Sequence, residues 1–102
     1  MNKYQIITTK EFEEELEKIY YYFLYFLKEI KLAKLFYSQI INSIFSLEYF
    51  PKRYNKVSNF LNYNNRDIRK LIIKKYIIIY EVNDILRTSY NSTYISSVLK
   101  II

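Results

Sequence analysis

Several residue types are missing from this 102-residue chain, which contains no cysteine, histidine, glycine or tryptophan and only one proline. Without cysteine and histidine the chain has no disulfides, no zinc site of the usual ligand sets and no histidine general base. Without glycine it has no glycine-rich phosphate loop. We therefore predict neither a metal nor a cofactor, and the lack of cysteine is compatible with a reducing, intracellular setting.

Long apolar runs are also missing. The longest, Ile19 to Leu27, has about half the length that a bilayer crossing needs, and Lys28 and Glu29 close it. The first ten residues, MNKYQIITTK, lack the apolar core and cleavage site of a secretory signal. We expect no membrane partner and a cytoplasmic location.

The residues that are present predict a folded protein. Hydrophobic residues make up 51% of the chain and aromatic residues 20%, which is enough apolar surface to offset the entropy of ordering the chain. At this length we expect one domain over residues 1–102 with a single core.

Charge is distributed unevenly along the chain, whose net charge is +6. Residues 1–50 hold six lysines and seven glutamates, whereas residues 51–102 hold ten basic residues against Asp67, Glu81 and Asp84. Such a basic half suggests a polyanion or an acidic protein as partner. A solvated surface without a partner is the alternative. The basic residues between positions 52 and 75 are Lys52, Arg53, Lys56, Arg66, Arg69, Lys70, Lys74 and Lys75.

The N-terminal half predicts a strand and two helices. Residues 3–7 favour a short strand, and Thr8 to Glu11 form a capping-box pattern that starts a helix. Apolar residues at steps of three and four then predict two helical faces, with a break near residues 29–32. Pro51 ends the second helix. The faces are Phe12, Leu16, Ile19, Phe23, Phe26 or Leu27 and Ile30 in the first helix, and Ala33, Phe36, Ile40, Ile44 and Leu47 in the second.

Tyrosines surround the first helix, which makes its surface unusually apolar for an exposed helix. Core packing or a partner groove explains them better than a cofactor site does. They are Tyr20, Tyr21, Tyr22 and Tyr25.

The C-terminal half predicts strands. Residues 66–73 and 76–82 read as a β-hairpin that turns at Lys74 and Lys75. The second strand is almost continuously apolar, which favours a central position with both faces largely covered. Residues 51–65, with a short extended piece at 56–60, and residues 85–93 read as connections, and Thr93 to Leu99 as the last strand.

This order of elements, with its spacing of particular residues, resembles the RelE/ParE toxin superfamily of bacterial toxin–antitoxin systems. The similarity covers roughly residues 3–83 and resumes weakly over the last strand. The residues that carry it are Ala33, Ile40, Ile44, Leu47, Pro51, Arg69, Tyr76 and Tyr80.

The resemblance implies an α+β fold, in which an N-terminal strand and a helical hairpin pack on a small antiparallel sheet whose basic face meets the target. It also implies a cognate antitoxin that covers part of the toxin. RelE-like members cut mRNA on the ribosome, whereas ParE-like members inhibit DNA gyrase and cut nothing. A homodimer and a toxin–antitoxin hetero-oligomer both stay open.

Two departures from the nuclease pattern favour the ParE-like mode slightly. Ile77 stands where nuclease members often carry an arginine after the tyrosine, and an apolar side chain cannot stabilise a transferring phosphate. The last strand offers only Lys100 before the chain ends at Ile102. A ribosome-dependent mRNA interferase and a degenerate, non-toxic antitoxin-binding module are the alternatives, so enzymatic activity is left open.

The candidate site residues fall into two groups. For Arg69 the alternative role is a structural ion pair with Glu48 or Asp67, and for the two tyrosines it is a place in the core. Glu48 lacks the second acid or histidine that a general base would use. The candidate target-binding residues are Arg69, Arg66, Lys70, Lys74, Lys75 and Arg53, and the second group is Tyr76, Tyr80, Lys100 and Glu48.

Overall fold

The computed structural model describes residues 3–57, 66–84 and 91–100. Over these residues the helical part comprises two α-helices, a π-helical turn and two short 3-10 turns, and four strands form the sheet. The elements are β1 (Tyr4–Thr8), α1 (Lys10–Tyr21), η1 (Tyr22–Phe26), α2 (Ile30–Phe45), η2 (Ser46–Glu48), η3 (Pro51–Arg53), β2 (Asp67–Ile73), β3 (Tyr76–Asn83) and β4 (Asn91–Lys100).

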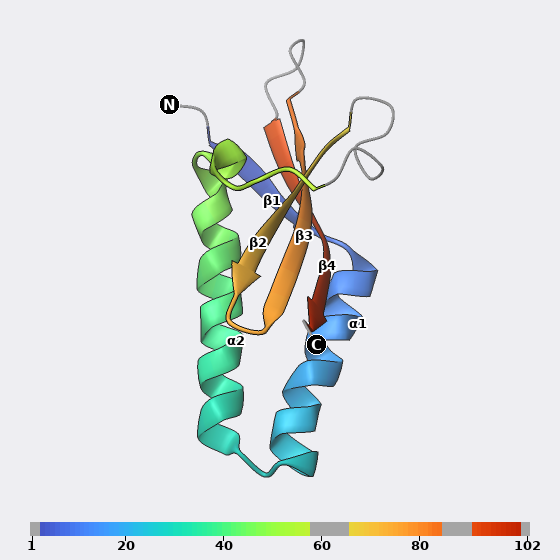
Figure 1. The fold of residues 1–102 in the computed structure, drawn as a ribbon, viewed down its shortest axis with the longest axis vertical. Helices are drawn as coiled ribbons and strands as arrows, with labels where there is room; N and C mark the ends of the chain where they lie inside the picture. Colours follow the sequence, from blue (N-terminus) through green and yellow to red (C-terminus); the bar gives the residue numbers. More distant parts are fainter. Residues whose placement is uncertain (1–2, 58–65, 85–90, 101–102) are drawn as a thin grey trace.

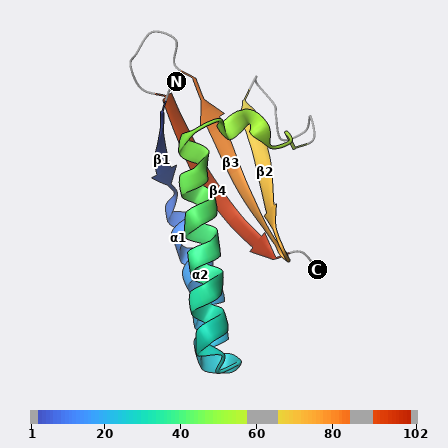
Figure 2. The ribbon, with the colours of Figure 1, turned by 90° about the vertical axis from the view of Figure 1, so that its left-hand side faces the viewer.

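The four strands lie in one sheet in the order β1-β4-β3-β2, and the two helices cover one of its faces (Figures 1 and 2). This confirms the predicted α+β class and its helical hairpin. The sheet is mixed rather than purely antiparallel, because β1 runs parallel to β4. The helices and the β2–β3 hairpin separate these two strands in sequence, so no tight turn imposes an antiparallel pairing on them.

Helix α1 begins one residue later than the capping pattern predicted. Thr8 is still part of β1 and pairs with Ile95, so the helix cap falls to Thr9. The Thr9 hydroxyl accepts a hydrogen bond from the Phe12 amide at 3.1 Å and donates one to the Ser96 carbonyl at 2.8 Å. Thr9 therefore both starts the helix and ties its first turn to β4.

The turn between the helices lies about two residues earlier than expected. After α1 the chain makes the π-helical turn, in which the Leu27 amide bonds the Tyr22 carbonyl at 3.0 Å, and α2 already begins at Ile30. Lys28 supplies the reversal with a positive φ of 55°. In a chain without glycine, an ordinary residue must adopt the left-handed conformation there.

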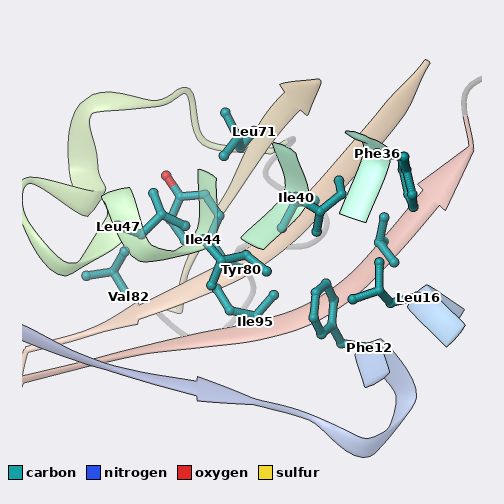
Figure 3. Close-up of a cluster of buried hydrophobic side chains, with 12 residues drawn as sticks. Phe12, Leu16, Phe36, Ile40, Ile44, Leu47, Leu71, Tyr80, Val82 and Ile95 are labelled. Carbon is teal, nitrogen blue, oxygen red and sulfur yellow. The ribbon is translucent and has the colours of Figure 1, made fainter. Parts of the chain in front are cut away.

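The core lies between the helices and the sheet (Figure 3), where the predicted second helical face is buried throughout. Each of its Phe, Ile and Leu side chains contributes roughly 1.5–3 kcal/mol by leaving water. The first helical face is buried only at its start, and Phe26, Leu27 and Ile30 lie exposed. The core cluster is Phe12, Leu16, Phe36, Ile40, Ile44 and Leu47 from the helical side, and Leu71, Ile78, Tyr80, Val82, Ile95 and Val98 from the sheet.

Strand β3 is an interior strand, as its apolarity predicted, but its two faces differ. Ile78, Tyr80 and Val82 are buried beneath the helices, whereas Ile77 and Ile79 on the opposite face are only half-buried in the described structure. The expected central position is confirmed, and the face away from the helices is covered less completely than the face beneath them. The helices supply cover on one side only.

The remaining strand predictions are confirmed with small shifts at the ends. Strands β2 and β3 turn at Lys74 and Lys75, and β4 begins at Asn91, two residues before the expected start. Lys56 forms an isolated bridge with Arg69, and the Val57 amide donates to the Ile68 carbonyl at 3.0 Å. Residues 58–60 of the expected extended piece lie outside the described residues. None of the described helices has both the length and the apolarity that a bilayer crossing requires.

Replacing Lys28 by glycine should stabilise the protein. The left-handed conformation costs an L-residue roughly 1 kcal/mol, and part of the relief is lost because glycine is more flexible when unfolded. We expect the free energy of unfolding, measured by urea denaturation and circular dichroism, to rise by about 0.5 kcal/mol. The matched variant Lys34→Gly, at an exposed position inside α2, should lower it by about 1 kcal/mol. Equal losses in the two variants would contradict this account of the turn.

Candidate functional site

Arg69 lies on β2, and its side chain is 12% exposed. Its guanidinium donates to the Asp67 carboxylate at 2.9 Å and to the backbone carbonyls of Lys52 and Tyr54, both at 2.7 Å. It therefore forms the ion pair with Asp67 that was the alternative to a target contact. These bonds tie the segment after η3 to β2, and they occupy donors that a target phosphate or carboxylate would need.

Arg53 is also engaged within the chain. One guanidinium nitrogen donates to the Ser46 carbonyl at 3.1 Å and to the Tyr49 carbonyl at 2.8 Å. Both residues follow the C-terminal end of α2. The guanidinium also stacks over the Tyr54 ring, 4.8 Å from its centre. A cation at a helix C-terminus satisfies free carbonyls and complements the helix dipole. This contact fixes the path of the chain from α2 into η3.

Other basic residues of the 52–69 region have acidic partners. Arg66 makes a two-point contact with Glu81, at 3.1 and 2.9 Å, and the hydrogen bonding to that carboxylate raises the pKa of Arg66. Lys52 pairs with Asp84, and Lys56 lies 4.0 Å from Asp67. Much of the positive charge in this region is therefore neutralised inside the chain.

Glu48 and Tyr80 occupy structural positions. The Glu48 carboxylate lies 3.4 Å from the Lys3 ammonium. Tyr80 is fully buried, and its hydroxyl donates to the Pro51 carbonyl at 2.6 Å. Burial raises the pKa of this hydroxyl, although Arg69 and Arg53 act in the opposite direction. At neutral pH Tyr80 is a hydrogen-bond donor inside the core.

Four predicted lysines have no ion pair in the part of the chain that the structure describes: Lys70, Lys74, Lys75 and Lys100. Lys70 lies on the face of the sheet away from the helices, opposite Ile79. Lys74 and Lys75 form the β2–β3 turn, and Lys100 ends β4 directly opposite Tyr76. The structure brings the last three together.

The turn lysines and Lys100 border a pocket of about 340 Å³ between the strand ends and the helical hairpin. Figures 1 and 2 show the hairpin extending beyond the sheet at this end of the molecule. We call this pocket, with its bordering lysines, the basic groove. Its lining is Tyr22, Phe23, Leu27, Leu32, Leu35, Phe36, Gln39, Ile73, Lys74, Lys75, Tyr76 and Lys100.

Tyr76 forms part of the floor of the basic groove. Its ring lies against Phe36, with 4.7 Å between the ring centres, and burial raises the pKa of its hydroxyl. The hydroxyl is therefore protonated at neutral pH and is a poor base. Ile77, where nucleases often carry an arginine, points to the opposite side of the sheet and takes no part in the groove.

The helical wall of the groove was missing from the predicted site residues. The tyrosine-rich first helix had suggested core packing or a partner groove, and Tyr22 does line this groove. Nothing in the sequence, however, distinguished Leu32 and Leu35 from other residues of a helix. Only the packing of the hairpin against the strand ends brings them beside the lysines.

Arg69→Ala should destabilise the fold, because it leaves Asp67 and two carbonyls without their donor. We expect a loss of about 3 kcal/mol in the free energy of unfolding, measured by urea denaturation. Arg69→Lys should recover little of it, since an ammonium cannot reproduce the planar fork of donors. Arg66→Ala breaks an exposed pair and should change stability far less. Equal stability of Arg69→Ala and Arg66→Ala would remove the structural role assigned here.

The contact of Asp84 with Lys52 and Tyr4 should make the free energy of unfolding depend on pH in the acid range. Burial alone raises the pKa of Asp84, but the hydrogen bonds from Lys52 and Tyr4 outweigh it and hold the pKa below its usual value. This stabilisation is present above the unfolded pKa of about 4 and is lost as pH falls through the lower folded pKa. In urea titrations at several pH values, Asp84→Asn should flatten the acid limb of the stability profile. Parallel profiles for the two proteins would contradict the shift.

Comparison with known proteins identifies a matching family. A search of curated proteins finds no match. The family model described as the ParE toxin of the type II toxin–antitoxin system parDE matches residues 6–92, which run from β1 to the start of β4. Since that match spans most of the chain, the protein belongs to the ParE toxin family of type II toxin–antitoxin systems, within the RelE/ParE superfamily that the sequence resembles.

Proposed function

We propose that this ParE-family toxin inhibits growth by binding DNA gyrase in the cytoplasm without cutting nucleic acid, and that Lys74, Lys75 and Lys100 supply its main electrostatic contacts. The observation that carries the proposal is the division of the basic residues. Arg53, Arg66 and Arg69 are hydrogen-bonded within the chain, whereas the three lysines meet at one end of it without an ion pair in the described structure.

The candidate catalytic groups support a non-enzymatic mode. Cleavage of RNA through its ribose hydroxyl needs a base whose pKa lies near neutrality and a cation beside the phosphate. Burial raises the pKa of Tyr76, and Glu48 is paired with Lys3. Arg69 is held by Asp67 and two carbonyls. Tyr76 is therefore a weak base, and Arg69 is held in a structural position.

The three lysines are suited to binding. Ammonium groups on flexible stems adapt to carboxylates in several geometries, and a cluster of one sign speeds encounters with an oppositely charged surface. The family also implies a cognate antitoxin, which must keep such a surface from its target. In this proposal the three arginines position the segment after α2 and the β2–β3 hairpin, and the lysines bind the target.

The proposal can be tested with purified toxin, gyrase and relaxed plasmid. We expect the toxin to block supercoiling. Lys74→Glu/Lys75→Glu should raise the inhibitory concentration at least about tenfold, which corresponds to a loss of about 1.4 kcal/mol in binding. The control Lys10→Glu/Lys18→Glu changes the net charge equally on α1, away from the groove lining, and should inhibit like the parent.

Three outcomes would overturn the proposal. Codon-specific mRNA cleavage in a translating extract, with supercoiling intact, would show the interferase mode. Normal growth on induction with neither effect would show a non-toxic antitoxin-binding module. Equal loss of inhibition in both charge-reversed variants would show that net charge alone matters, and not the groove.

A further inference from the structure

The turn of the helical hairpin carries a cluster of exposed apolar side chains. Of the fourteen exposed large apolar side chains in the described structure, nine lie between positions 21 and 37. Tyr25 and Phe26 are 73% and 74% exposed. A contiguous apolar surface on a folded protein marks an interaction site. We call this surface the hairpin tip, and its residues are Tyr21, Tyr22, Tyr25, Phe26, Leu27, Ile30, Leu32, Leu35 and Tyr37.

The aromatic rings of the hairpin tip pack on one another at the surface. Tyr22 stacks on Phe26 with 5.1 Å between the ring centres, and the ring centre of Tyr21 lies 5.6 Å from that of Tyr25. Three of these rings belong to the π-helical turn η1, and such turns recur at functional sites. Figures 1 and 2 show this end of the hairpin extending beyond the sheet. The tip is therefore a projecting surface with its rings already in place.

The charge at the hairpin tip is mainly positive. Lys28, Lys31 and Lys34 are exposed and have no ion pair in the part of the chain that the structure describes. Glu29 is the only acidic residue between positions 18 and 47. Lysine stems can lie along an apolar surface while their ammonium groups reach phosphates beside it. Aromatic rings interspersed with lysines are typical of surfaces that lie between lipid headgroups and acyl chains.

We propose that the hairpin tip binds peripherally to an anionic lipid bilayer, with its aromatic rings at the boundary of headgroups and acyl chains and Lys28, Lys31 and Lys34 beside the phosphates. The inference goes beyond the proposed function and does not depend on it. The expectation of no membrane partner rested on the lack of an apolar run long enough to span a bilayer. A peripheral contact enters only about 5–10 Å and needs no such run.

Other occupants fit the hairpin tip less well. The tip of a second copy would bring the three lysines against their own counterparts, and like charges repel. Nucleic acid would pair with the lysines but would leave Ile30 and Leu32 without an apolar contact. A soluble protein would need a concave apolar surface shaped to the tip, whereas a bilayer adapts to a projecting surface of any outline.

The chain contains no tryptophan, which allows a direct test of insertion by fluorescence. Phe26→Trp places a single fluorophore at the tip, and the control Phe45→Trp places one at the other end of α2, where the side chain is also exposed. The test uses vesicles of phosphatidylglycerol and phosphatidylcholine in equal parts. We expect the emission of Phe26→Trp to shift to shorter wavelength and to be quenched by brominated acyl chains. Phe45→Trp should show neither change.

Serine variants of the full chain locate the apolar contact by co-sedimentation with the same vesicles. Tyr25→Ser/Phe26→Ser should weaken binding at least about tenfold, because two large rings no longer leave water. The control Phe45→Ser/Phe50→Ser also removes two exposed rings and should bind like the parent. Unfolding in urea, followed by circular dichroism, shows that the variants compared are folded.

Charge-reversed variants test the lysines. Vesicles with phosphatidylglycerol should bind the parent at least about tenfold more tightly than phosphatidylcholine alone, because each lysine near an anionic surface adds attraction. Lys31→Glu/Lys34→Glu should lose this preference and bind vesicles that contain a cationic lipid instead. The control Lys10→Glu/Lys70→Glu changes the net charge equally, at the start of α1 and on the sheet face away from the helices, and should keep the parent's preference. An exchange of preference requires a folded protein, so it separates a lost contact from a lost fold.

Several results would overturn the inference. Binding without the wavelength shift or the quenching of Phe26→Trp would show adsorption by charge alone. Equal changes in Phe45→Trp would show that the tip is not the contact. Sedimentation as a dimer without any vesicle binding would identify a second copy as the occupant, and binding of a labelled single-stranded oligonucleotide in place of vesicles would identify nucleic acid. Because these assays contain no gyrase, their failure and a failure to inhibit supercoiling are distinguishable.

Discussion

The arrangement of this protein depends on the hydrogen bonds that attach the segment after α2 to the sheet. The Tyr80 hydroxyl, buried in the core, donates to the Pro51 carbonyl, and the Arg69 guanidinium donates to the carbonyls of Lys52 and Tyr54. Buried donors of this kind are costly to leave unpaired. Because they bind backbone carbonyls, they fix the path of the chain itself, and with it the placement of β2 and β3 relative to α2.

The position of the basic groove follows from that attachment. Strand β2 runs from the fixed segment along the helices and β3 returns antiparallel to it, so their turn at Lys74 and Lys75 lies at the other end of these two strands, beside the helical hairpin (Figure 1). The contact of Tyr76 with Phe36 holds this lower end together. The two ends of the β2–β3 hairpin therefore differ in character. The end near Pro51 is held by an internal network of hydrogen bonds, and the turn at the other end leaves cations and apolar side chains open to a partner.

Local patterns in the sequence predicted most of the elements, and long-range packing decided what they could not. The period of Phe36, Ile40 and Ile44 and the apolar run of β3 are local features, and both gave the observed elements. The cap moved from Thr8 to Thr9 because pairing with β4 keeps Thr8 in the sheet. That is a contact across more than eighty residues, which no local pattern contains.

The candidate site was harder to predict for the same reason. Side-chain type identified Arg69 and Lys74 equally well as cations, but only the fold shows which of them has carbonyl and carboxylate partners nearby. The groove joins residues from η1, α2, the turn and β4. Its helical wall could be anticipated only as an excess of tyrosine on the first helix, with no indication of which strand end it meets.

The choice between arginine and lysine in this chain has a physical basis that bears on its function. A guanidinium offers several donors in a fixed plane and is weakly hydrated, so it can bind carbonyls and a carboxylate at once in a nearly buried position, as Arg69 does. An ammonium is strongly hydrated and adaptable, and it stays at the surface until a charged partner replaces its water. Arginines in structural positions and lysines around an open apolar groove are what a protein needs if it must hold a rigid shape and still exchange one partner for another. A toxin that is restrained by an antitoxin and released onto a target has that requirement.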